Sequence, residues 1–281
     1  MSPGGISIQA LPLLRDLIHE RAGIYFDDDQ LELLMDKISQ LVTERGLDSI
    51  LDYYYLLKYD ADADREWKNL IDTLSVRETF FWREVDQIRT LAEVLVPRYL
   101  QEGVPVRIWS AACATGEEPL TIAIALAEQG ILGSDKLEIH GSDVSQHALN
   151  VARQGVYRER SMRNLPQKLR EKYFLPNGKD AWRVRPDIHQ KVHWSSINLM
   201  SPETACLANS RFIFCRNVFI YFSAGAIRKA VKSFSDCMPH PGYLFLGAAE
   251  SLLRVATNFE LQEINGAFVY VSSVASGKVE V

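Results

Sequence analysis

The chain has 281 residues, of which 47% are hydrophobic and 24% are charged, and its formal net charge is −5. This amino-acid composition is ordinary for a globular protein, and the length suits one large or two ordinary domains. Together they exclude a disordered chain, a collagen-like repeat and a disulfide-stapled miniprotein. The negative charge argues against nucleic acid as a partner. Because no run of about 18 apolar residues and no signal-peptide pattern occurs, we predict a cytoplasmic protein without direct membrane insertion.

Charge is distributed unevenly along the chain. Residues 1–75 hold 7 Lys/Arg and 15 Asp/Glu, a net charge of −8. Residues 156–191 hold 10 Lys/Arg and 4 Asp/Glu, a net charge of +6. An acidic beginning and a basic middle segment indicate different roles for the two regions.

The cysteine and histidine pattern gives no sign of a metal centre. The chain has four cysteines, Cys113, Cys206, Cys215 and Cys237. None forms a CxxC pair or has a histidine at zinc-finger spacing, and the six histidines are scattered. We therefore interpret the cysteines as small buried hydrophobes and predict no metal.

The first part of the chain, residues 1–75, is predicted to be a small helical domain. Apolar residues recur there at helical spacing, and Gly23 and Gly46 are placed to end two of the helices. An alternative is that these helices only cover the core of the rest. The predicted helices lie around residues 11–18, 31–41, 47–59 and 67–74.

The pattern changes after a linker and helix at 76–103. Strands and helices alternate over 104–281, which predicts the α/β class, with a mostly parallel sheet covered by helices on both faces. The last two strands are too close for a crossover helix, so we expect a hairpin there. The predicted strands are 104–111, 137–142, 192–197, 211–215, 243–248 and 267–272, and the helices are 119–128, 145–153 and 226–238.

Residues 156–191 interrupt this alternation. A short helix is predicted over 166–173, and Asn177-Gly178 is a strong turn signal between two short strand-like stretches. We interpret the segment as an inserted β-subdomain.

Three strand ends carry the residues that point to chemistry, because ligands of open α/β sheets bind beyond the carboxyl ends of the strands. The first is WSAACATGEEP at 109–119, a run of small residues with two glutamates; it has neither a phosphate-loop pattern nor the GxGxxG pattern of NAD-dependent dehydrogenases. The second is GSD at 141–143, whose Asp143 could bind a ribose diol or cap the next helix. The third is CRNVFIYF at 215–222. An acidic loop of this kind suits a cofactor with a cation or ribose hydroxyls.

At this point the sequence resembles a known family. SVRETFFWRE (75–84), WSAACATGEEP, GSD, SSINL (195–199), FCRNVFIYF and GYLFLGAAESL (242–252) are similar, in order and spacing, to the CheR-type chemoreceptor glutamate O-methyltransferases. The resemblance implies a Rossmann-like class I methyltransferase sheet, a preceding helical domain and an inserted β-subdomain. It also implies S-adenosylmethionine as methyl donor, with S-adenosylhomocysteine as the product.

The resemblance also assigns site residues by position. It implies catalytic roles for Arg83 and Tyr221, with Arg83 orienting the substrate carboxylate and Tyr221 lining the reacting end. Arg77 stands where the family often has Asn or Gly. The residues that it implies in cofactor binding are Arg77, Thr79, Arg83, Glu118, Asp143, Asn198, Leu199, Arg216 and Asn217.

The implied activity is methylation of glutamate side chains on methyl-accepting chemotaxis proteins, through their cytoplasmic domains and by a monomeric enzyme. Two alternatives stay open at this level: a methyltransferase of the same fold acting on another protein or small acid, and a non-catalytic module that binds S-adenosylmethionine as a signal. Because the helical domain is acidic, we expect receptor docking to use the basic insert. The residues expected there are Arg163, Lys168, Arg170, Arg183 and Arg185.

Overall fold

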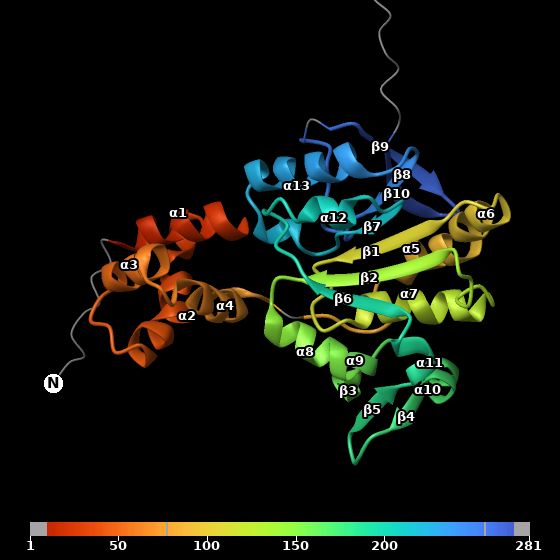
Figure 1. The fold of residues 1–281 in the computed structure, drawn as a ribbon, viewed down its shortest axis with the longest axis horizontal. Helices are drawn as coiled ribbons and strands as arrows, with labels where there is room; N and C mark the ends of the chain where they lie inside the picture. Colours follow the sequence, from red (N-terminus) through yellow and green to blue (C-terminus); the bar gives the residue numbers. More distant parts are fainter. Residues whose placement is uncertain (1–9, 77, 256, 273–281) are drawn as a thin grey trace, which may run out of the picture.

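The computed structural model describes residues 10–76, 78–255 and 257–272, and it divides into a helical lobe and a lobe built on a sheet (Figure 1). The α-helices are α1 Leu11–Ala22, α2 Leu31–Glu44, α3 Ile50–Tyr59, α4 Ala63–Leu74, α5 Val85–Thr90, α6 Val96–Gln101, α7 Glu117–Glu128, α8 Gln146–Gln154, α9 Glu159–Met162, α10 Gln167–Tyr173, α11 Pro186–His189, α12 Thr204–Ala208 and α13 Ala224–Cys237. Short helical turns are η2 Asp28–Gln30, η3 Leu91–Leu95 and η4 Phe219–Tyr221. The strands are β1 Val106–Ala111, β2 Leu137–Asp143, β3 Val156–Arg158, β4 Phe174–Pro176, β5 Ala181–Val184, β6 Val192–Ser196, β7 Phe212–Phe214, β8 Gly242–Phe245, β9 Phe259–Ile264 and β10 Ala267–Ser272.

The helical lobe consists of α1–α4, which bury an apolar cluster of their own. Gly23 ends α1 in the left-handed conformation, with φ 76°, and its N–H donates to the His19 carbonyl. Two of these helices begin at other residues than predicted. The Ser49 side chain caps α3, which therefore begins at Ile50 and not at residue 47, and α4 begins four residues earlier than predicted, at Ala63.

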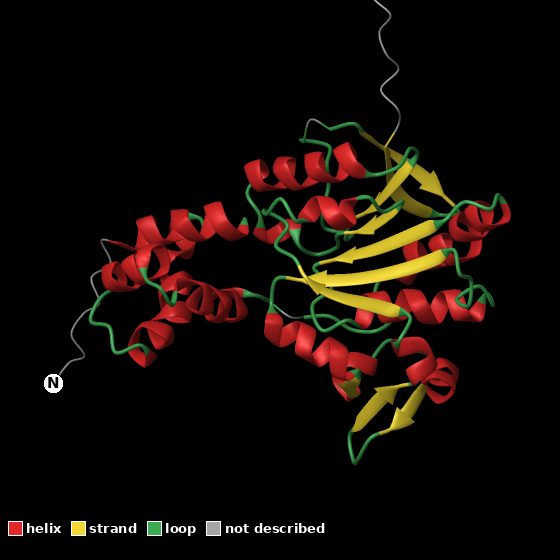
Figure 2. Ribbon diagram, viewed as in Figure 1, coloured by secondary structure: helices red, strands yellow, loops and turns green. Residues whose placement is uncertain are grey.

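The second lobe is a seven-stranded sheet in the order β6-β2-β1-β7-β8-β10-β9. Strands β6, β2, β1, β7 and β8 are parallel, and β10 is antiparallel to both of its neighbours. Neighbouring side chains of a strand point to opposite faces, so Ile108 joins the cluster under α5–α7, and Trp109 joins the cluster that includes α13 residues. Helices therefore cover both faces of the sheet, which confirms the predicted α/β class (Figure 2).

One strand of this sheet was not predicted. β9 is an edge strand whose residues FELQEI are mostly exposed, so it shows no apolar alternation. It pairs with β10 through the turn at Asn265-Gly266, while β10 inserts between β8 and β9. The hairpin pairing expected near the end of the chain is therefore present, as β8 beside β10 and β9 beside β10.

The insert folds as a separate three-stranded sheet, in the order β3-β5-β4. The Asn177 N–H donates to the Ala181 carbonyl at 2.8 Å, and Gly178 has φ 81°, so the predicted turn joins β4 to β5. Figure 1 shows this small sheet projecting below the main sheet, next to α9, α10 and α11.

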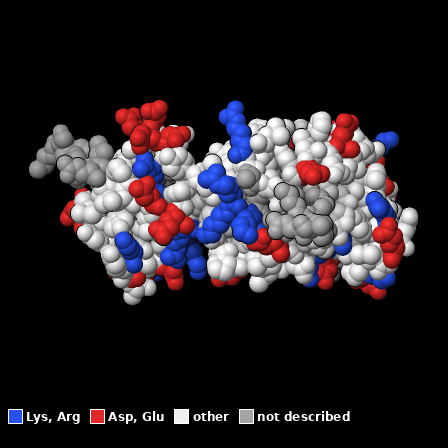
Figure 3. All heavy atoms as spheres, turned by 90° about the horizontal axis from the view of Figure 1, so that it is seen from above, with Lys and Arg blue, Asp and Glu red and all other residues white. Residues whose placement is uncertain are grey.

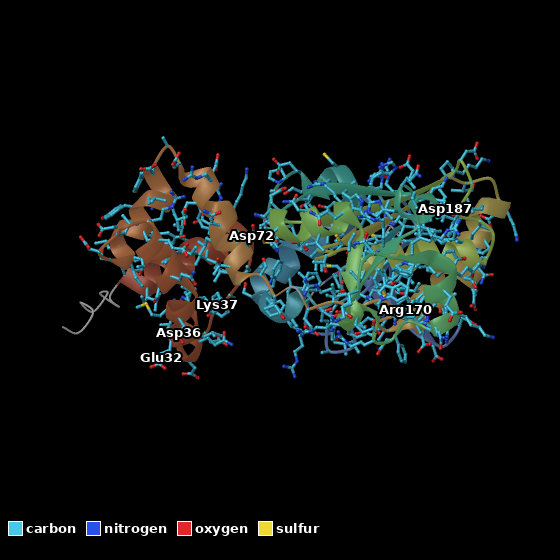
Figure 4. The ribbon with its side chains drawn as sticks, turned by 90° about the horizontal axis from the view of Figure 1, so that it is seen from below. Glu32, Asp36, Lys37, Asp72, Arg170 and Asp187 are labelled. Carbon is cyan, nitrogen blue, oxygen red and sulfur yellow. The ribbon has the colours of Figure 1, made fainter. Side chains whose placement is uncertain are left out.

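The two lobes meet beside the strand ends. Ile24 forms an isolated antiparallel bridge with Phe222, and the Tyr25 N–H donates to the Tyr221 carbonyl at 2.9 Å. On the other side, the Asp72 carboxylate of α4 accepts hydrogen bonds from Ser145 and from the backbone at the start of α8 (Figure 4). In the described ranges, we find no helix with the length and apolar character needed to cross a membrane.

Candidate functional site

A cavity of about 250 Å³ lies at the carboxyl ends of the parallel strands, and residues of the helical lobe form part of its wall. A polar pocket adjoins it, and the two share Val76, Ala112, Ala114 and Asn217. The sequence-predicted residues on these two hollows are Thr79, Arg83, Glu118, Asp143, Asn198, Leu199, Arg216, Asn217 and Tyr221. Arg77, the remaining one, lies outside the described residues. The structure thus brings together side chains that are up to about 140 positions apart in the chain.

The loop after β1 needs small residues for conformational and packing reasons. Ala112 and Ala114 have φ of 60° and 48°, in the left-handed region. Gly116 has φ 93°, and a Cβ there would lie 2.8 Å from the Trp194 ring and 2.9 Å from the Ala152 Cβ. Ala112 and Ala114 of this loop line both the cavity and the polar pocket.

Asp143 ends β2 and lines the cavity. One carboxylate oxygen accepts from the Ala114 N–H and the other from the Ser145 N–H, each at 2.8 Å. The side-chain cap of α8 is Ser145, whose hydroxyl accepts from the Ala148 N–H, so Asp143 is not itself that cap. Burial raises the pKa of Asp143, although the two backbone donors oppose this rise.

The two glutamates of the loop separate in space. Glu117 is buried and accepts hydrogen bonds from the hydroxyls of Thr115 and Ser161, and burial raises its pKa. Glu118 points toward the polar pocket, where it accepts from the Ser110 hydroxyl at 2.6 Å and from Arg216 at 2.6 Å. Of the two glutamates, only Glu118 therefore lines the site, and its carboxylate is already paired with the guanidinium of Arg216.

Arg216 connects three segments with one guanidinium, whose side chain is only 2% exposed. Besides Glu118, it donates to the backbone carbonyls of Arg83 and Glu84 and to the Gln87 side chain. Almost all of its donors are used within the protein. We interpret its side chain as a positioning group for the segment that carries Arg83.

Arg83 is half-buried at the edge of the polar pocket, where its guanidinium donates to the Glu78 carbonyl at 3.1 Å. The insert also holds this segment. Arg160 and Arg163 of the insert both pair with the Glu78 carboxylate. The Phe81 N–H donates to the Ser161 carbonyl of the insert at 2.9 Å. The insert thus helps to fix the backbone that presents Arg83.

Tyr221 lies at the mouth of the cavity and is 37% exposed. Partial burial raises the pKa of its hydroxyl, and the positive charge of Arg83 opposes that rise. The two residues assigned catalytic roles by resemblance therefore influence one another electrostatically. A protonated tyrosine hydroxyl can donate one hydrogen bond to a bound carboxylate.

Three further predicted residues lie on loops at the cavity wall. Asn198 donates to the Arg21 carbonyl at 2.6 Å and accepts from the Met200 N–H, so it also ties the lobes together. Leu199 is buried beside it. Asn217 has φ 60°, a conformation that asparagine tolerates better than most residues.

Sequence reasoning missed Glu250. Its carboxylate accepts four backbone N–H groups at 2.7–2.8 Å, from Gly247, Asn217, Val218 and Phe219. It therefore fixes the loop that runs from Asn217 to Tyr221. Its position in GYLFLGAAESL, just after the last parallel strand, is the one signal that could have identified it.

The cysteine prediction is correct for Cys113 and Cys215, which are buried and whose pKa values burial raises well above the usual range. It is wrong for Cys206, which is exposed, and Cys237 is intermediate. Within residues 10–76, 78–255 and 257–272, we find no group of three or more His, Cys, Asp or Glu side chains arranged to hold a metal ion.

Comparison with known proteins identifies the family. Residues 9–75 match the family described as CheR methyltransferase, all-alpha domain, and residues 77–268 match CheR methyltransferase, SAM binding domain. The chain is 32% identical to Chemotaxis protein methyltransferase 2 of Vibrio cholerae, over 91% of this chain and 90% of that protein. It is 29% identical to the Chemotaxis protein methyltransferase of Escherichia coli, over 92% of this chain and 89% of that protein. The chain therefore belongs to the CheR methyltransferase family and is an S-adenosylmethionine-dependent methyltransferase.

Proposed function

We propose that the chain transfers a methyl group from S-adenosylmethionine to glutamate side chains of methyl-accepting chemotaxis receptors. The products are glutamate 5-O-methyl ester and S-adenosylhomocysteine. The observation that carries this proposal is the position of Arg83 on the polar pocket and of Tyr221 on the adjoining cavity, which Asp143 also lines. The names of the relatives, all chemotaxis protein methyltransferases, support the choice of receptors as substrates.

The residues of the cavity fit the methyl donor. The Asp143 oxygens each hold one backbone N–H, and a carboxylate has about four acceptor sites, so it can also accept from both hydroxyls of a ribose. Val144, Ile197 and Leu199 provide apolar walls for a base. Asn198 and Asn217 offer carboxamides at the same wall. We assign these residues to binding of the donor, with Thr79 and Glu118 at its polar end.

When bound, S-adenosylmethionine supplies a methyl group on a positively charged sulfur, which is already an activated electrophile. A glutamate carboxylate is ionised near neutral pH, so the acceptor requires no base. Arg83 offers paired N–H donors that orient the carboxylate, and Tyr221 donates a further hydrogen bond. Positioning of this kind can lower a barrier by about 7–11 kcal/mol.

We propose the following organisation. Residues 1–75 form the helical domain, and residues 76–103 form a linker and helix that contribute to the donor site. Residues 104–281 form the methyltransferase domain, with the inserted β-subdomain at about 156–191. The separate apolar cluster of α1–α4 supports the first division. The enzyme acts as a cytoplasmic monomer on the cytoplasmic domain of the receptor.

The test is to incubate the protein with methyl-labelled S-adenosylmethionine and a purified receptor cytoplasmic domain. The proposal predicts label in the receptor that mild base releases as methanol, because carboxyl methyl esters hydrolyse readily. Label that resists base would indicate a different acceptor atom. Formation of S-adenosylhomocysteine without receptor labelling would also contradict the proposal.

A further inference from the structure

Basic side chains gather over α13 on the face seen from above in Figure 3. This helix exposes Arg228, Lys229 and Lys232. Lys232 pairs with Asp236 at 2.7 Å. Arg228 and Lys229 have no acidic partner within 4 Å in the described part of the chain. These two charges are therefore free to attract an acidic partner.

A second segment adds to the same surface. Leu252 is buried in the apolar cluster that also contains Phe219 and the inner face of α13, so the residues that follow it emerge beside them. Leu253 is 82% exposed, and Arg254 is exposed as well. Arg254 has no ion-pair partner among the residues that the structure describes. Leu253 therefore adds an exposed apolar side chain to this basic surface.

This surface adjoins the mouth of the reaction cavity. Ile220, which is 52% exposed, and Tyr221 line the mouth, and α13 begins only three residues after Tyr221, at Ala224. At 1.5 Å per residue, Arg228 lies about 6 Å along the helix from its start. A partner that reaches Tyr221 therefore meets the first turns of α13.

The insert is a second basic region, and part of its charge is paired with carboxylates. In the insert, Arg163 pairs with Glu78, Arg170 with Glu159, and Arg185 with Asp187, while Arg183 donates to a backbone carbonyl. The expectation that docking uses the insert stays a prediction, because Lys168 and Arg183 have no carboxylate partner within the described ranges. The test below compares the insert with the α13 surface.

Helix α2, on the opposite side of the mouth, is acidic. Figure 4 shows Glu32 and Asp36 beside Lys37 on this helix. Lys37 itself lines the cavity and is only half-exposed. An acidic partner would meet like charges on α2, which disfavours docking there.

From this arrangement we infer that the substrate docks on the α13 surface, formed by Ile220, Tyr221, Arg228, Lys229, Leu253 and Arg254. The partner that fits it is an amphipathic polypeptide helix with glutamates along one face. One glutamate enters beside Arg83 and Tyr221, glutamates one and two turns away face Arg228 and Lys229, and apolar side chains of the helix pack on Ile220 and Leu253. This inference rests on the proposed function and names the surface through which it is carried out.

The test compares two double charge reversals in the full-length protein: Arg228→Glu with Lys229→Glu, and Arg183→Glu with Arg185→Glu as the matched control in the insert. With a receptor cytoplasmic fragment as substrate, the α13 variant should raise the KM for the fragment about tenfold, as loss of complementary rim charges does. Its kcat and its affinity for S-adenosylmethionine should stay at wild-type values. Its KM should also depend less on salt than that of the wild type. The insert variant should behave as wild type.

An α13 variant with unchanged KM, or an insert variant with the larger effect, would overturn the inference. Direct binding of the fluorescently labelled fragment, measured by anisotropy without methyl donor, separates this test from the proposed function. If the wild type binds the fragment but transfers no methyl group, the proposed function fails, and the docking surface is still judged by the affinity of the α13 variant. If the wild type does not bind the fragment even at low salt, the docking inference is wrong.

Discussion

The guanidinium of Arg163 lies over the ring of Phe80, with its central carbon 3.7 Å from the ring centroid. Arg83 approaches the same ring, at 5.5 Å. Arg163 belongs to the insert, whereas Phe80 and Arg83 belong to the segment between the lobes. The insert is therefore part of the structure that positions Arg83, in addition to any role as a separate surface.

Arg163→Ala should lower kcat for methyl transfer about tenfold. The variant loses the cation–π contact and one ion pair with Glu78, which together are worth about 1–2 kcal/mol, so the segment that carries Arg83 becomes less ordered. Affinity for S-adenosylhomocysteine, measured by calorimetry, should change much less. The control is Arg158→Ala, an exposed arginine of β3. Equal losses in the two variants would show that Arg163 has no specific role.

Asp143→Ala should weaken binding of S-adenosylmethionine by about 1–3 kcal/mol, because it removes charge-assisted hydrogen bonds. Calorimetry on the purified protein measures this directly. Asp135→Ala, at an exposed position away from the cavity, is the matched control and should bind as wild type. Unchanged affinity in the Asp143 variant would remove this residue from the donor site.

Glu250→Ala should reduce both stability and turnover. It leaves four N–H groups without their acceptor, and losses of this kind cost about 1–3 kcal/mol. We expect a Tm lower by roughly 2–12 °C, from the usual 2–4 °C per kcal/mol for domains of about this size. Glu260→Ala, on the exposed strand β9, should leave Tm unchanged. A Glu250 variant with wild-type Tm and kcat would show that the loop holds its conformation without this carboxylate.

Because the carboxyl of Glu117 is buried, the contribution of Glu117 to the stability of the folded protein should depend on pH. Burial raises the pKa of Glu117 in the folded protein, so the folded state holds this proton more tightly than the unfolded state does. The resulting destabilisation is absent below the unfolded pKa of about 4.3 and grows as pH rises through the raised folded pKa. The Tm of Glu117→Gln, relative to wild type, should therefore increase between about pH 4 and pH 7. A difference in Tm that is constant or decreases over this range would contradict the assignment.

Much of the fold could be predicted because local patterns and tertiary structure agree. The apolar strands of the parallel sheet are buried on both faces, and the turn at Asn177-Gly178 has a distinctive composition. β9 could not be predicted in this way, because an exposed edge strand carries polar residues on both faces.

The residues of the candidate site could be predicted from the sequence more completely than the contacts that hold them in place. Asp143 and Asn217 were identifiable as polar residues directly after apolar strands. The pairing of Glu78 with Arg160 and Arg163 joins residues more than 80 positions apart, and no local pattern reveals such a contact. The same is true of Arg216, whose position is visible in the sequence but whose partners at Arg83, Glu84 and Glu118 are not.

The central claim is that Arg83 and Tyr221 serve methyl transfer to a glutamate carboxylate. The most direct measurement is to map the methylated residues of a receptor cytoplasmic fragment by peptide mass spectrometry, after incubation with wild-type protein and with Tyr221→Phe at saturating donor. The account predicts a methyl group on glutamate side chains with the wild type, and a lower turnover with Tyr221→Phe without loss of donor binding. Methylation at any other residue type, or full turnover in Tyr221→Phe, would contradict it.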